Sequence, residues 1–334
     1  MSTDLLVPLL LPLASWPLTR TAARRLPPGF ASWLLVLSGL VLAGGSTAAL
    51  MVQAFGGLTL IPAVADLGHY SPTDLRLETD VNGTLAVISG SLLTLIVLAG
   101  IRMALRYRRW ARALHRELDA HSPESGVIVL PGEEPVAFAL PGRGGRIAIS
   151  SGMLAALDPH ERCALLAHER AHLRCRHHFF LAAVTLSTLL NPLLRPLGSA
   201  ARFALERWAD EAAANRVGNR TLVANAVAKA ALAGRSDTPF AMAATGGPLP
   251  RRVSALLAEP SPRRRITAAV LAALVLGAAG WSAQAALEAA TELHDGIEIA
   301  QGMAPGHHPV PGQRAHCKSA LAAVLQQQRK CAKR

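Results

Sequence analysis

The chain has 334 residues, of which 51% are hydrophobic and 17% are charged, and its formal net charge is +12. The length allows about two ordinary domains, and the composition argues against a plain soluble protein, because so apolar a chain is expected to place several segments in lipid. The arginines cluster beside the apolar segments, so we interpret the positive charge as a topology signal and expect no direct nucleic acid binding.

Four apolar segments are predicted to span the bilayer: 5–18, 30–55 and 82–101 in an N-terminal membrane domain (1–118), and 266–287 near the C-terminus. The first segment is the weakest, because it contains three prolines. As a helix it covers only about 21 Å of a hydrocarbon core of about 30 Å. Two arrangements of this segment stay open: it spans the bilayer with help from its flanks, or it lies at the interface.

Charge orients these segments. Arginines fill the loop 19–29 and recur through the region 102–265, whereas the loop 56–80 holds only Arg76. The positive-inside rule therefore places the first two regions in the cytoplasm, and the N-terminus and the short tail 288–334 outside. The pattern predicts a multi-pass protein of the plasma membrane.

A small α+β domain is predicted at 119–265. Short strands separated by Pro-Gly and Gly-Gly turns are expected at Val127–Leu130, Val136–Leu140 and Arg146–Ser150. A helix begins after Asp158, which is a natural N-cap that forms a capping box with Glu161.

An apolar run, 179–194, follows this helix and is interrupted by Asn191 and Pro192. We interpret 179–197 as a membrane-dipping hairpin. A further helix is predicted over Ser199–Val217, and Gly218 ends it.

The sequence His168-Glu169-Arg170-Ala171-His172 carries the chemistry. Positions i and i+4 share one helix face, so both imidazoles can bind one metal ion. Zn2+, one per chain, would acidify a water molecule, and Glu169 would act as the catalytic base. Arg170 is expected to project away from the ligand face. The alternative interpretation is a helix with two ordinary histidines and a solvated glutamate.

A catalytic zinc needs a third protein ligand, and Glu206 is the best candidate. Asp210 lies one turn further on the same face and could fix the tautomer of a ligand histidine. Surface exposure of both acids is the alternative, although the apolar residues between and before them argue against it. His177 and His178 are weaker candidates, because they follow His172 closely, and we expect them at the membrane interface. Glu206 must lie on the same side of the membrane as the histidines, so the run 179–194 must return rather than cross.

The order of strand, His-Glu-x-x-His helix, apolar hairpin and Glu206-x-x-x-Asp210 resembles the membrane gluzincin peptidases. Two branches are similar: the heat-shock and prenyl-protein membrane proteases, and the BlaR/MecR-type antirepressor peptidases. The N-terminal spans and the arginine-rich entry to the domain favour the second branch. The expected fold is therefore an α-helical integral membrane protein with an inserted gluzincin domain.

The resemblance implies a zinc metalloendopeptidase whose active site faces the cytoplasm and whose protein or peptide substrate is a transcriptional repressor. BlaR/MecR sensors carry a penicillin-binding domain after the last span, for which 288–334 is too short, so the inducing signal is open. The resemblance also implies an edge strand that binds extended substrate, for which 147–150 is our candidate. The alternative for 147–150 is an ordinary strand of the sheet.

Other functional classes remain in competition. Within the enzymes, a quality-control protease is the alternative to repressor cleavage. A non-catalytic signalling protein with a structural zinc would need four protein ligands, and the sequence offers three good ones. A transporter would be expected to keep a charged residue in the middle of a span, and none has one.

Overall fold

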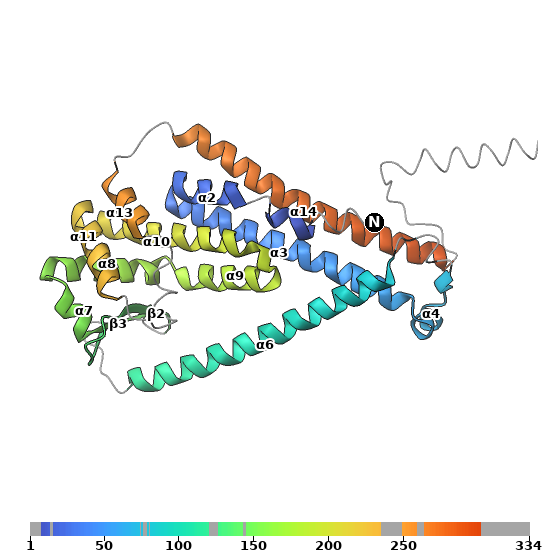
Figure 1. The fold of residues 1–334 in the computed structure, drawn as a ribbon, viewed down its shortest axis with the longest axis horizontal. Coiled ribbons are helices and arrows are strands. Elements are labelled where there is room, and N and C mark those ends of the chain that lie inside the picture. The colour runs from blue at the N-terminus through green and yellow to red at the C-terminus, as the bar shows by residue number, and fades with distance from the viewer. Residues whose placement is uncertain are drawn as a thin grey trace, which may run out of the picture.

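The computed structural model describes residues 8–13, 16–73, 75, 79, 81–119, 126–142, 145–234, 249–258 and 264–301. Three long helices form its frame: α3 (Pro28–Thr59), α6 (Gly83–Asp119) and α14 (Arg264–Ala300). Figure 1 shows α6 and α14 close together at one end of the molecule and splayed apart at the other, with α3 and the shorter helices between them. Each long helix contains a stretch long and apolar enough to cross a membrane. Membrane association is therefore supported.

Small residues allow α3 to pack closely against its neighbours. A Cβ atom at Gly45 would lie 2.7 Å from the Ser282 hydroxyl of α14, and one at Gly57 would lie 2.2 Å from the Ala86 Cβ of α6. Larger side chains at these crossings would push the helices apart.

The predicted segment 5–18 lies partly outside the described residues. Residues 8–13 of it are helical, and α2 (Trp16–Arg25) begins near its end. Within the described ranges, the helices that meet the length and apolarity of a span are the three long ones.

The sheet has three strands, β1 (Val127–Leu130), β2 (Ala137–Leu140) and β3 (Arg146–Ser150), in the order β1-β3-β2. β3 pairs with β1 in parallel and with β2 in antiparallel orientation. The expectation that 147–150 is an edge strand is therefore wrong. Ile147, Ala148 and Ile149 are all buried, and a strand that is apolar on both faces belongs at the centre of a sheet.

Two helices follow the sheet, the short α7 (Ser151–Ala156) and α8 (Pro159–Arg174), which carries the His-Glu-x-x-His motif. The predicted capping box is present: the Asp158 carboxylate accepts from the Glu161 backbone N–H, and the Glu161 carboxylate accepts from that of Asp158. Together these bonds satisfy two backbone donors and fix where the motif helix begins.

The chain then reverses direction. α9 (His177–Leu190) leads through the short 3-10 helix η1 (Pro192–Leu194) into α10 (Arg195–Val217). The α10 helix starts earlier than the predicted Ser199, because Pro196 falls in its first turn, where proline is tolerated. It ends as predicted before Gly218, whose φ of 74° is left-handed.

The turn of this hairpin is fixed to α3. The Asn191 side-chain amide donates to the Ser46 hydroxyl over 2.9 Å, and both groups are buried. How deeply the hairpin enters a membrane stays a prediction.

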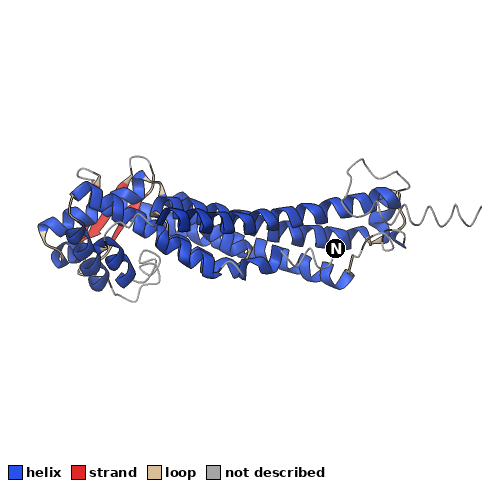
Figure 2. Ribbon diagram, turned by 90° about the horizontal axis from the view of Figure 1, so that it is seen from above, coloured by secondary structure: helices blue, strands red, loops and turns tan. Residues whose placement is uncertain are grey.

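Two further helices, α11 (Arg220–Ala233) and α13 (Leu249–Leu257), pack against α10. Small buried residues of α8, α10 and α11 form a shared core with Leu256 of α13. Figure 2 shows these helices and the sheet gathered at one end of an elongated bundle.

Candidate metal site

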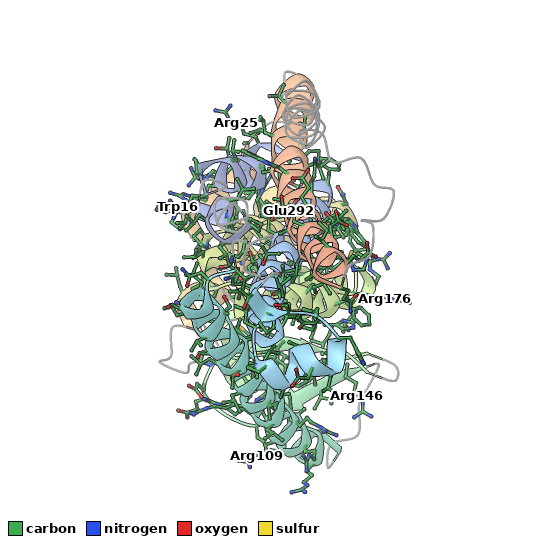
Figure 3. The ribbon with its side chains drawn as sticks, turned by 90° about the vertical axis from the view of Figure 1, so that its right-hand side faces the viewer. Trp16, Arg25, Arg109, Arg146, Arg176 and Glu292 are labelled. Carbon is green, nitrogen blue, oxygen red and sulfur yellow. The ribbon has the colours of Figure 1, made fainter. Side chains whose placement is uncertain are left out.

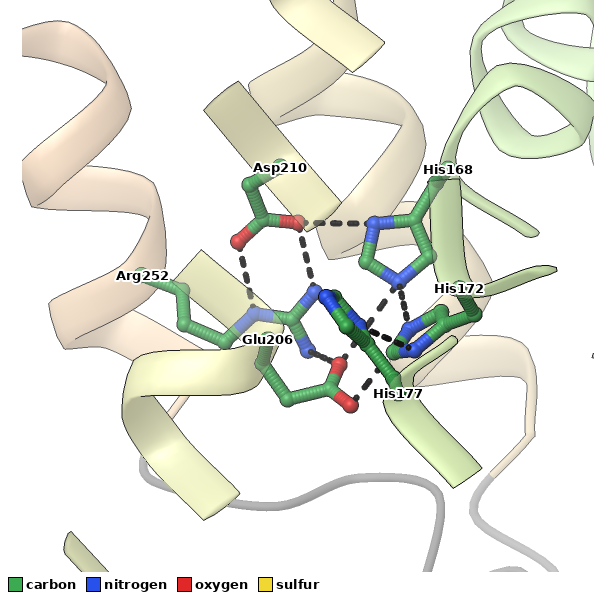
Figure 4. Close-up of polar contacts among 6 residues, drawn as sticks. All are labelled: His168, His172, His177, Glu206, Asp210 and Arg252. Atoms are coloured by element: carbon green, nitrogen blue, oxygen red, sulfur yellow. Dashed lines mark hydrogen bonds and ion pairs between the residues drawn. The ribbon is translucent and has the colours of Figure 1, made fainter. Parts of the chain in front are cut away.

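Three side chains from two helices converge at the candidate site. His168 and His172 lie one turn apart on α8, and their Nε2 atoms are 3.1 Å from each other. Glu206 of α10 places one carboxylate oxygen 3.6 Å from His168 Nε2 and the other 3.6 Å from His172 Nε2 (Figure 4). The structure thus brings the three predicted ligands together.

The spacing of these atoms fits a metal ion. Tetrahedral coordination with bonds of about 2.0–2.1 Å places neighbouring ligand atoms about 3.3 Å apart. The measured separations of 3.1, 3.6 and 3.6 Å bracket that value. Two imidazole nitrogens and one carboxylate are also the donor set of many catalytic zinc sites, which leave a fourth position for water or substrate. These three residues could therefore hold a zinc ion.

The predicted base and the predicted supporting acid are both buried at the site. Glu169, only 9% exposed, follows His168 on α8. Asp210, one turn beyond Glu206, places Oδ1 3.0 Å from His168 Nδ1. A carboxylate at Nδ1 favours the proton on that nitrogen, which leaves the Nε2 lone pair free for a metal ion. This geometry suits the role predicted for Asp210.

The site is electrostatically prepared for a cation. Burial opposes charge on His168, but the Asp210 and Glu206 carboxylates outweigh it and raise the pKa of the imidazole to about 10. Burial also opposes charge on Glu206, yet Arg252 and the two histidines lower its pKa to about 2. Without a metal ion, the carboxylates therefore stay ionised and hold a proton on His168, which a divalent cation would displace.

Arg252 of α13 is a member of the site that the sequence reasoning missed. Its Nε and one terminal nitrogen donate to the two oxygens of Asp210 over 2.8 and 2.7 Å, and its other terminal nitrogen lies 3.0 Å from Glu206. The side chain is 6% exposed. From the sequence, Arg252 is one of several arginines that precede the last span, and no local pattern separates it from its exposed neighbour Arg251.

His177 is the second missed member, and its expected place at the membrane interface stays a prediction. It is fully buried, and its Nδ1 lies 2.9 Å from Nδ1 of His172. Its ring packs against Trp208, with ring centroids 5.0 Å apart. His177 therefore contacts His172 at Nδ1, as Asp210 contacts His168 at Nδ1. No helical period indicates this contact, because Arg176 adopts a left-handed conformation and turns the chain between the two histidines.

Comparison with known proteins agrees with this chemistry. Residues 104–202 match the model of peptidase family M48. The matched stretch includes His168, Glu169 and His172 and ends before Glu206. No curated protein and no solved structure matches the chain. The match supports a metallopeptidase of family M48, whose members typically use zinc, and the three apolar helices are consistent with a membrane-associated one. The similarity to the BlaR/MecR branch stays a prediction.

Replacing His177 by Phe should weaken zinc binding. Phenylalanine preserves the packing against Trp208 but removes the nitrogen that contacts His172, and such a loss typically lowers metal affinity about 10- to 100-fold. Chelator competition on the purified protein measures this affinity. His178→Phe is the matched control and should leave it unchanged. Equal affinities in the two variants would show that the contact does not support the site.

Replacing Arg252 by Met should destabilise the metal-free protein strongly. It leaves only the protonated His168 to balance two buried carboxylates, and the loss of one partner from such a buried group typically costs about 3–5 kcal/mol. Arg251→Met, on the exposed neighbour, should change stability by less than about 0.5 kcal/mol. Thermal unfolding in detergent after chelation measures both. Adding Asp210→Asn to Arg252→Met should restore part of the loss, and strictly additive effects would contradict the ion pair.

Proposed function

We propose that this protein is an integral-membrane zinc endopeptidase, with His168, His172 and Glu206 as ligands and Glu169 as catalytic base. The spacing of the three ligand atoms is the observation that carries the proposal, because those distances suit one tetrahedral ion. A group of three protein ligands leaves a position open for catalysis, whereas a structural zinc uses four.

The residues of the site have different roles in peptide hydrolysis. Bound zinc supplies an acidified water and polarises the scissile carbonyl. Glu169 accepts the proton of the attacking water and later transfers it to the leaving amine. Asp210 and His177 hold the two ligand imidazoles from behind, so that their Nε2 atoms keep facing Glu206.

β2, whose outer edge pairs with no strand among the described residues, is the proposed docking strand for an extended substrate. The Ser150 N–H donates to the Val136 carbonyl, so residues 136, 138 and 140 point their backbone groups toward β3. The backbone groups of Ala137 and Ala139 then point to the outer edge, where a substrate strand can pair with them. β2 also packs against α8, which keeps such a strand beside the motif helix.

We further propose that the protein carries out regulated proteolysis at the cytoplasmic face, with a transcriptional repressor as substrate. This role is supported by the resemblance to the antirepressor peptidases and by the arginine-rich stretch that follows the apolar part of α6. Those arginines favour the cytoplasm for the domain that they introduce.

The substitution Glu169→Gln tests the catalytic base separately from metal binding. The variant should keep its zinc and lose cleavage of β-casein, an unstructured probe, by at least about 1,000-fold, because the attacking water loses its proton acceptor. Zinc content and product formation are measured on the same reconstituted sample. His168→Ala, the control, should lose both. Wild-type cleavage rates in Glu169→Gln would refute the mechanism, and loss of zinc from it would make Glu169 a structural residue instead.

Topology reporters test the orientation. Fusions after residue 150 and after residue 215 should both report the cytoplasm, because His168, His172 and Glu206 must meet on one side of the membrane. Reporters on opposite faces would mean that the segment between them crosses. Both reporters outside would preserve the ligand set and overturn the cytoplasmic assignment.

A further inference from the structure

A second polar site lies on the side of α8 that faces away from the metal ligands. It is an open cleft of about 460 Å³ between the C-terminal half of α8, the turn into α9 and the described residues 141, 142 and 145 that follow β2 and precede β3. Arg170 lines it, and this residue is rotated by about 200° from His168 around the helix. The cleft is therefore separate from the candidate metal site.

Among the described residues, the side chains with charge that line the cleft are all basic. They are Arg170, Arg174, Arg176 and His178, and no acidic residue of the described ranges lines it. Among the residues that the structure describes, none of the three arginines forms an ion pair with an acidic side chain. Several arginines that line one cleft are suited to bind a phosphate group.

Two backbone features shape the walls of this cleft. Arg176 has a φ of 53°, a left-handed conformation that costs a residue other than glycine about 1–2 kcal/mol. Gly145, with a φ of 52°, lies against Leu173, and a Cβ there would come within 3.3 Å of the Leu173 side chain. The strained conformation keeps Arg176 beside Arg174 and His178, and such strain tends to persist at functional sites.

The cleft opens at the level where headgroups of a bilayer would lie. Gly100 of α6, near the end of its apolar stretch, lies against Leu189 of α9. Ten residues of a helix span about 15 Å. That length leads from Leu189 back to Phe179 on α9 and from Gly100 forward to Trp110 on α6.

Aromatic and basic side chains mark this level on both helices. Tyr107 and Trp110 of α6 lie beside Arg102 and Arg106, a combination typical of membrane interfaces. On α9, Phe179 follows His178 directly and is 62% exposed. In Figure 3, which views the molecule along its length, Arg176 projects outward from the flank of the bundle.

We propose that this cleft binds the phosphate group of an anionic phospholipid, such as phosphatidylglycerol, from the leaflet that contacts the domain. Arg170, Arg174 and Arg176 hold the phosphate, and the acyl chains follow Phe179 and the exposed apolar face of α9. The inference rests on the proposed membrane placement and is independent of peptidase activity. Because Arg170 lies between the two ligand histidines on α8, a bound headgroup fixes the motif helix against the membrane surface.

Native mass spectrometry of the full chain, delipidated in detergent, tests this site. Wild type should retain one added phosphatidylglycerol in preference to phosphatidylcholine. Arg174→Gln combined with Arg176→Asn should weaken that binding about 10- to 30-fold, since removal of one cation near an anionic headgroup lowers the binding affinity roughly tenfold or less. Asparagine tolerates the left-handed conformation at 176, so the double variant should fold. Arg176→Lys, which keeps the charge, should lose much less.

Arg216→Gln combined with Arg251→Gln is the matched control, because it removes the same charge from two exposed arginines elsewhere. Equal weakening in the control would reduce the effect to net charge and overturn the site. So would equal binding of the two lipids by wild type, or displacement of the lipid by millimolar inorganic phosphate alone. Unchanged lipid binding with lost β-casein cleavage in the double variant would instead assign the cleft to substrate. Zinc content should stay unchanged in every variant, which keeps this test separate from the peptidase proposal.

Discussion

The ion pairs between Arg252 and the carboxylates of Asp210 and Glu206 are the interaction on which the site depends. Three carboxylates, those of Glu169, Glu206 and Asp210, are buried among helices α8, α10 and α13. One positive charge from Arg252 and two from a divalent cation would balance their three negative charges. Charges of one sign are not tolerated in a protein interior without such compensation. The arginine therefore organises the site in the absence of metal and leaves it with the charge deficit that a divalent cation fills.

This cluster is tied to the membrane helices through α10. Arg207, the residue after the candidate ligand Glu206, is buried and donates to the backbone carbonyls of Ala23 and Arg24 at the end of α2. Residues of α10 also share a hydrophobic core with α2 and α3, and Trp208 packs against Gly29 at the start of α3. The helix that carries the candidate third ligand thus packs against the N-terminal helices. A shift of α2 and α3 would therefore move Glu206 relative to His168 and His172.

The sequence predicts the parts of this arrangement that one helix or one strand determines. His168 and His172 share a face because of the helical period, as do Glu206 and Asp210, and the capping box fixes the start of α8 locally. The sequence does not predict contacts that depend on chain reversal. His177 reaches His172 only through the left-handed turn at Arg176, and Arg252 arrives from a separate helix. The central place of β3 likewise depends on a parallel crossover from β1, which the alternation of residues cannot indicate.

Arginine at the third position of the His-Glu-x-x-His motif has a physical reason. A motif helix that is buried all round would need an apolar residue there, because a charge on the back of the helix would have to be paired. Arg170 is exposed instead, and the basic cleft lies on that side of α8. The helix therefore separates two electrostatic environments: carboxylates on the side of α10, and arginines on the opposite side that form no ion pair within the described part of the chain. If the basic cleft binds an anionic membrane surface as proposed, this polarity would turn the face with the candidate ligands inward, and one helix would carry those ligands and set their distance from the bilayer.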